Sequence, residues 1–118
     1  MQFHLKIEDT VWHKFRSKYF NSTSKVIEKL VGEWIEGSTK FPYLTSDMIK
    51  KFQQKRTKNT IQVGIHIDDI VSKNFKHKCI DLNNIQRAIV IRMLIDYDLN
   101  IKKNIIRQNY KSGAIVYE

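Results

Sequence analysis

The sequence predicts a mostly helical fold made of two copies of one strand–helix–helix unit that pack against each other. The segment Lys6–Val11 (KIEDTV) returns sixty residues later as His66–Val71 (HIDDIV). In each copy, apolar residues first alternate and then recur every four positions, which are the periods of a strand and of a helix. A chain of 118 residues fits a single domain, and one copy alone is too short to bury a core.

Each copy is predicted to begin with a short strand that buries one face. The alternating apolar residues are Phe3, Leu5 and Ile7 in the first copy and Val63, Ile65 and Ile67 in the second. Polar residues or glycine fill the positions between them, and successive side chains on a strand point to opposite faces. One face of each strand is therefore expected in the core and the other in solvent.

A first helix is predicted after each strand. Its apolar stripe consists of Val11, Phe15 and Tyr19 in one copy and of Val71, Phe75 and Cys79 in the other. The carboxylates of Glu8–Asp9 and Asp68–Asp69 stand at the expected helix starts, where they can accept hydrogen bonds from free N–H groups and favour the positive end of the helix dipole. Cys79 and Trp34 are expected in the core, whereas Trp12 is expected to be partly exposed.

A second helix is predicted in each copy after a polar turn. Residues 21–24 (NSTS) supply turn and N-cap chemistry in the first copy, and residues 81–84 (DLNN) do so in the second. Gly37 is placed to end the second helix of the first copy.

The chain is thus divided into four segments, which are the first unit 1–37, a connector 38–60, the second unit 61–99 and a tail 100–118. The connector is expected to contain a short helix over 46–52 with Ser46 as its N-cap. The beginning of the tail is expected to prolong the last helix.

The positive charge lies outside the repeated units. The chain has 21 Lys and Arg against 12 Asp and Glu, a net charge of +9. Six basic residues accompany one acidic residue in the connector, and four accompany one in the tail, whereas the units are nearly neutral. This bias favours a polyanionic partner, with nucleic acid first and an anionic membrane surface second.

Other features narrow the class of protein. A single cysteine rules out an internal disulfide framework and suits a reducing, cytoplasmic location. No apolar run reaches the length of a membrane span, and the first residues do not resemble a secretory signal. The four histidines are not in metal-ligand spacing, and there is no Gly-rich phosphate loop and no nucleophile beside a base. We therefore expect no metal, no cofactor and no enzymatic activity.

The alternating strand and the Ser-rich start of the second helix, within about forty residues, resemble the ribbon-helix-helix (Arc/MetJ-like) DNA-binding family. The resemblance covers roughly 2–36 and 61–98, and the duplication is similar to that of tandem conjugative relaxosome accessory proteins. It implies that one strand from each unit pairs in a two-stranded antiparallel ribbon that enters the DNA major groove. The implied fold is a pair of tandem ribbon-helix-helix repeats that form an intrachain pseudo-dimer, with ribbon pairing between two chains as the alternative.

The resemblance further implies that the exposed ribbon face reads DNA bases. The positions concerned are Gln2, His4, Lys6, Gln62, Gly64 and His66. Gln makes paired hydrogen bonds to adenine, and Lys or His donates to guanine. A pseudo-twofold axis would pair Gln2 with His66, His4 with Gly64 and Lys6 with Gln62. Gly64 cannot read a base, and either lets the backbone approach DNA or marks a bulge, so the two halves should read unequally and the site need not be palindromic.

Phosphate contacts are implied at the N-terminus of each second helix, where free N–H groups attract anions. The residues at these places are Ser22, Thr23, Ser24, Lys25, Asn83 and Asn84, all of which also suit ordinary capping and turns. Sequence-independent affinity is expected from the connector residues Lys50, Lys51, Lys55, Arg56 and Lys58.

These expectations describe a sequence-specific double-stranded DNA-binding protein, a transcriptional regulator such as a repressor or a DNA-accessory factor. It would act as a single-chain pseudo-dimer, with further association on DNA left open. The alternative is a protein-binding inhibitor or antitoxin whose basic connector and tail wrap an acidic target. RNA binding through the connector is a third option, but exposed aromatic residues for base stacking are not evident.

Overall fold

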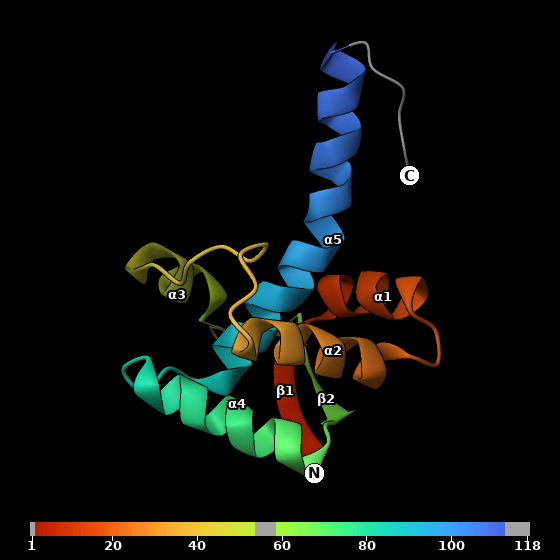
Figure 1. Ribbon diagram of the computed structural model, residues 1–118. Coiled ribbons are helices and arrows are strands. Elements are labelled where there is room, and N and C mark those ends of the chain that lie inside the picture. The colour runs from red at the N-terminus through yellow and green to blue at the C-terminus, as the bar shows by residue number, and fades with distance from the viewer. Residues whose placement is uncertain (1, 54–58, 113–118) are drawn as a thin grey trace.

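The computed structural model describes residues 2–53 and 59–112, and side chains as far as residue 100 (Figure 1). The elements are β1 (Gln2–Glu8), α1 (Asp9–Lys18), α2 (Thr23–Ile35), α3 (Ser46–Phe52), β2 (Thr60–His66), α4 (Asp69–Asp81) and α5 (Arg87–Ser112). The predicted class, mostly helical with a two-stranded antiparallel sheet, is confirmed.

The two strands pair antiparallel within one chain. The register is Gln2 with His66, Phe3 with Ile65, His4 with Gly64, Leu5 with Val63, Lys6 with Gln62, Ile7 with Ile61 and Glu8 with Thr60. It contains the three pairs expected from the sequence. The burial alternates as well, since Leu5 and Ile65 are fully buried while their neighbours along each strand are partly or fully exposed. The ladder skips no residue, so the suggested bulge at Gly64 is wrong.

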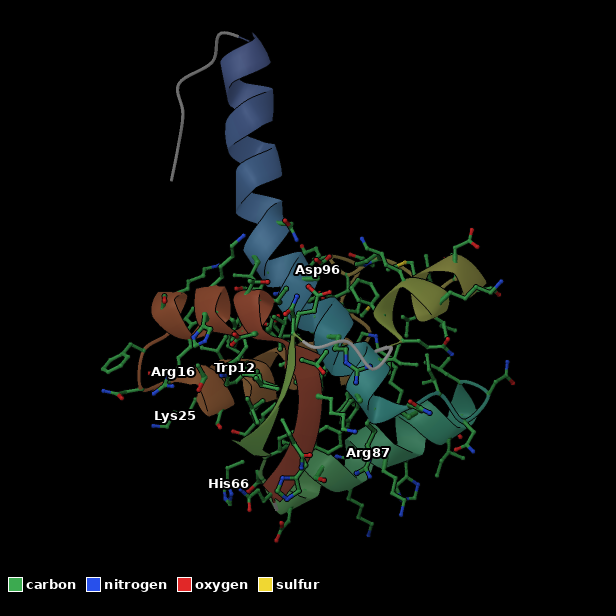
Figure 2. The ribbon with its side chains drawn as sticks, turned by 180° about the vertical axis from the view of Figure 1, so that it is seen from behind. Trp12, Arg16, Lys25, His66, Arg87 and Asp96 are labelled. Carbon is green, nitrogen blue, oxygen red and sulfur yellow. The ribbon has the colours of Figure 1, made fainter. Side chains whose placement is uncertain are left out.

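The helices cover one face of this ribbon, and Figure 2 shows the strands from the other side. A single hydrophobic cluster joins side chains from both strands and from α1, α2, α4 and α5. Phe15 and Phe75, sixty residues apart, are 0% and 1% exposed. Cys79 and Trp34 lie in the core as predicted.

The expected partial exposure of Trp12 is wrong, because this side chain is 8% exposed and belongs to the core cluster. Its ring centroid lies 6.1 Å from that of Phe15, three residues further along α1. Residues three apart share a helix face, so the buried side of α1 is wider than the four-residue stripe suggested. Ser72, sixty residues after Trp12, is likewise buried.

Local hydrogen bonds explain where α2 ends and where α3 begins. Gly37, with φ of 81°, follows α2 in the left-handed conformation, and its N–H donates to the Trp34 carbonyl at 3.1 Å. The Ser38 N–H donates to the Glu33 carbonyl at 3.1 Å, which completes a Schellman motif and confirms the predicted stop. The N-cap of α3 is Thr45 and not Ser46, because the Thr45 hydroxyl accepts from the Met48 N–H at 3.3 Å.

The carboxylates at the two expected helix starts behave differently. Asp68 caps α4, since its Oδ2 accepts from the Ile70 N–H at 3.1 Å. Glu8 stands at the equivalent place before α1 but makes no side-chain capping bond. Asp9, in the first turn of α1, instead contacts His13 Nε2 at 2.7 Å.

α5 begins later and extends further than the repeat alone indicates. Asn83 and Asn84 have φ of 61° and 57°, and this left-handed pair delays the start of the helix to Arg87. The helix then continues to Ser112, as expected for the start of the tail, and its second half projects from the body of the molecule (Figure 1). No helix in the described ranges combines the length and apolarity needed to cross a membrane.

Candidate functional site

The ribbon face opposite the helices carries all six residues predicted to read bases. Every one of them is exposed, namely Gln2, His4, Lys6, Gln62, Gly64 and His66. The register sets them in three rows across the two strands. The five side chains supply two carboxamides, one ammonium and two imidazoles, so the face is rich in hydrogen-bond donors and also carries acceptors.

Gly64 leaves space for the side chain of Gln2. A Cβ atom at position 64 would come within 2.6 Å of Gln2 Nε2, although Gln2 pairs across the ladder with His66. The Gln2 carboxamide therefore lies diagonally over the glycine. The absence of a side chain at 64 gives the middle row, which pairs His4 with Gly64, a different surface from the row of Lys6 and Gln62.

Helices α5 and α2 fix the outer edges of the ribbon. On the β1 side, Arg92 Nε donates to the Lys6 carbonyl at 2.7 Å and Arg92 Nη1 donates to the Phe52 carbonyl at 2.8 Å. On the β2 side, the His66 N–H donates to Ser24 Oγ at 3.1 Å. Burial lowers the pKa of Arg92, but arginine stays charged at any physiological pH. The backbone of two predicted base readers, Lys6 and His66, is thus held by a helix.

The N-terminus of α2 lies beside the end of β2, as the predicted phosphate contact requires. Ser22 is the N-cap residue but makes no side-chain capping bond, and it is exposed. A shallow pocket of about 520 Å³ is lined by the predicted residues 22–25 and by Asn21, Glu28, His66 and Asp68. Ser24 accepts from the ribbon, so its own hydroxyl hydrogen remains available to an anion.

Two basic residues that the sequence reasoning missed flank the ribbon. Arg16 of α1 is exposed and lies on the same side of the ribbon as Lys25 in Figure 2. Arg87, the first residue of α5, lies on the other side, with its guanidinium carbon 5.3 Å from the ring centroid of Phe3. The sequence offered a signal for each residue. Arg16 lies shortly before the first polar turn, residues 21–24, and Arg87 lies shortly after the second, residues 81–84.

Asn83 and Asn84 do not occupy the expected place at the N-terminus of α5. Both are exposed in the turn that precedes Arg87. Their expected position at the start of the second helix is therefore wrong, because both residues have left-handed backbone conformations and the helix begins only at Arg87. Their contact with phosphate stays a prediction.

The structure describes only two of the five basic connector residues that were predicted to contact phosphate. Lys50 and Lys51 lie exposed on α3, and Lys51 Nζ is 5.2 Å from the ring centroid of Phe52. Lys55, Arg56 and Lys58 lie outside the described residues. Among the residues described, no group of three or more His, Cys, Asp or Glu is arranged to hold a metal ion.

Cys79 provides a test of the core. Burial raises the pKa of its thiol to about 11, and the positive charges of Arg87 and Lys78 offset only part of this effect. The thiolate is the reactive form, so we expect almost no reaction with a disulfide reagent at pH 8 in the folded protein and rapid reaction in denaturant. Absorbance of the released thiolate measures both rates. Comparable rates in the two conditions would show that Cys79 is accessible.

Comparisons of the chain with protein-family models, with curated proteins and with solved structures find no match.

Proposed function

We propose that this protein is a sequence-specific double-stranded DNA-binding protein of the ribbon-helix-helix type, acting as a regulator or DNA-accessory factor without catalysis. The observation that carries the proposal is the exposed ribbon face, where Gln, His and Lys side chains are in register on a two-stranded ribbon. A ribbon of this kind fits the major groove, and these side-chain types match the donors and acceptors of base edges there.

A pseudo-dimer of tandem repeats is part of the proposal. The first helix of each unit packs on the second helix of the other unit. Helix α1 of the first unit contacts α5 of the second, and α4 of the second unit contacts α2 of the first. Lys18 and Lys78, sixty residues apart, make matching contacts. Lys18 Nζ donates to the Asp98 carbonyl of α5 at 3.0 Å, and Lys78 Nζ donates to the Ile35 carbonyl of α2 at 3.0 Å. This reciprocity supports an approximate twofold relation between the units.

The positions on either side of the ribbon support contact with both DNA strands. The N-terminus of α2, with Lys25, lies on one side, and the N-terminus of α5, with Arg87, lies on the other. Helix N-termini attract phosphates through free N–H groups and the helix dipole. The two sides differ in sequence and turn geometry, so the bound site should be asymmetric.

Selection of bound duplexes from a random DNA pool at near-physiological salt tests the function. Enrichment of one short motif, lost in a triple Gln2, Lys6 and Gln62 alanine variant, supports base reading by the ribbon. Weak, salt-sensitive binding without enrichment would reject the proposal and favour a protein partner.

Lys6→Ala and Lys25→Ala are a matched pair that separates base reading from phosphate contact. Both side chains are exposed, so neither change should alter stability. Lys6→Ala should weaken binding to the selected motif by about 1–3 kcal/mol and hardly affect random DNA. Lys25→Ala should weaken both alike and reduce the salt slope by about one. Binding titrations over a salt series measure these quantities, and equal losses for both variants on both DNAs would count against the ribbon as the reader.

A further inference from the structure

We propose that Gly64 positions the side chain of Gln2 to read an adenine at the middle row of the ribbon. The middle row is the pair of His4 and Gly64. The backbone of Gln2 belongs to the end row, opposite His66, which is labelled in Figure 2. This inference rests on the proposed DNA-binding function and assigns one base of the target to one side chain.

The backbone at Gly64 gives no reason for a glycine. Its φ is not in the positive range that favours this residue. The ladder passes through it without a bulge, and a glycine in the interior of a strand weakens the strand. The remaining common reason for a glycine in a strand is the close approach of another group.

The group that approaches Gly64 is the side chain of Gln2. The three atoms nearest to an ideal Cβ at position 64 are Gln2 Nε2 at 2.6 Å, Cδ at 3.5 Å and Cγ at 3.8 Å. A methyl group cannot share this space with the carboxamide, because non-bonded heavy atoms pack at about 3.5–4.0 Å. Gln2 is exposed, so an alanine at position 64 would displace the end of this side chain and leave the core as it is.

The corresponding glutamine of the second strand has no such space. Gln62 lies sixty residues after Gln2 in the sequence. Its diagonal neighbour across the ladder is His4, in the same row where Gln2 finds Gly64. Diagonal neighbours are about 7–8 Å apart, within reach of a long side chain, but His4 carries a side chain where Gly64 carries none. Gln62 therefore lacks the open space that Gln2 uses.

The position of the Gln2 carboxamide decides which base it can read. A glutamine makes paired hydrogen bonds to the N6 and N7 atoms of adenine, and this contact needs the amide opposite that base. With the amide over Gly64, the adenine lies in the base pair that faces the middle row, beside the imidazole of His4. DNA there meets the side chain of Gln2 and not the main chain of the glycine.

Selection from a random DNA pool, followed by binding titrations, tests the assignment. Gly64→Ala and Gln2→Ala should lose the preference for adenine at the same base pair, and each should weaken binding to the wild-type motif at least about fivefold. The preference at the base pair that faces Lys6 and Gln62 should remain, which a general loss of structure would not allow. The urea midpoint of Gly64→Ala should be no lower than that of the wild type.

A double-mutant cycle separates positioning from direct contact of the glycine backbone with DNA. If Gly64→Ala acts through Gln2, adding it to Gln2→Ala should weaken binding by less than about twofold more. Gln62→Ala is the matched control, because its effect and that of Gly64→Ala should multiply. Gln2→Asn keeps the carboxamide on a shorter side chain and should also lose the adenine preference. This last variant decides the question even where Gly64→Ala folds poorly.

The outcomes distinguish this inference from the proposed function. A wild type that selects no motif would reject both. A motif that Gly64→Ala or Gln2→Asn selects unchanged, or a full effect of Gly64→Ala in the Gln2→Ala background, would overturn the positioning role and leave base reading by the ribbon in place. A shared loss of preference for a base other than adenine would overturn the assignment of the base.

Discussion

Phe15→Ala and Phe75→Ala should each lower the free energy of unfolding by about 3–5 kcal/mol, because each removes a fully buried aromatic ring and leaves a cavity. The two positions lie sixty residues apart and are nearly identical in burial, so the two losses should be similar. Phe20→Ala is the matched control, and its exposed side chain predicts little change.

Urea unfolding followed by fluorescence and circular dichroism measures these effects. Trp12 lies near Phe15 and Trp34 lies near Phe75, with ring centroids 6.1 Å and 5.7 Å apart. Single-tryptophan variants therefore report separately on the part of the core around Phe15 and on the part around Phe75. One shared core predicts a single coincident transition from both probes, whichever phenylalanine is replaced. A transition that shifts at one tryptophan only would show that these two parts of the core unfold independently.

Asp98→Asn should cost about 2 kcal/mol of stability, since the Asp98 carboxylate accepts from Lys18 Nζ and from the Tyr19 hydroxyl, each at 2.8 Å. These two bonds join the end of α1 to α5, and the Lys18 and Asp98 side chains are only 24% and 16% exposed. Lys73, which is exposed on α4, offers a control in Lys73→Gln, for which no comparable loss is expected.

The same cluster predicts a loss of stability in alkali. Burial opposes the charge on Lys18, but its hydrogen bond and attraction to Asp98 outweigh burial and raise the pKa of the amine above its ordinary value. Burial and the bond to Asp98 also raise the pKa of Tyr19, against the effect of Lys18. Both groups hold their protons more tightly in the folded state, so their stabilisation is complete below pH of about 10 and is lost as pH rises through the raised pKa values.

Unfolding free energies from pH 7 to 11.5 check this sign. The difference between the wild type and the Asp98→Asn protein should be constant to about pH 10 and narrow above it, because Lys18 then loses its charge. A difference that widens in alkali would contradict the assignment of the Lys18–Asp98 pair.

The alternation of apolar residues correctly predicted which face of the ribbon is buried. The register followed from an expected pseudo-twofold axis, which correctly placed Lys6 opposite Gln62. Gly37 also followed from a local rule, since few other residues adopt its positive φ readily. Local patterns of this kind depend on neighbours in sequence and can be inferred without a structure.

The wrong or missed predictions concern features that depend on local backbone conformation or on contacts between residues far apart in the sequence. Nothing in periodicity indicated that Asn83 and Asn84 would both be left-handed and delay α5. Arg92 bonds to carbonyls of Lys6 and Phe52, which are 86 and 40 residues away, and such contacts have no sequence signal. Arg87 lies beside the ribbon because α5 begins at this residue and is bonded to β1 through Arg92. This side of the candidate site could therefore not be predicted from the sequence.

The pairing of β1 with β2 inside a single chain has a consequence for dilute conditions. Strands on separate subunits meet at a rate and to an extent set by protein concentration, and such assemblies dissociate on dilution. Strands tethered to one another experience an effective local concentration on the order of millimolar, whatever the number of molecules in the cell. A few copies of this protein would therefore keep an intact ribbon, and each strand is free to acquire substitutions that its partner does not share.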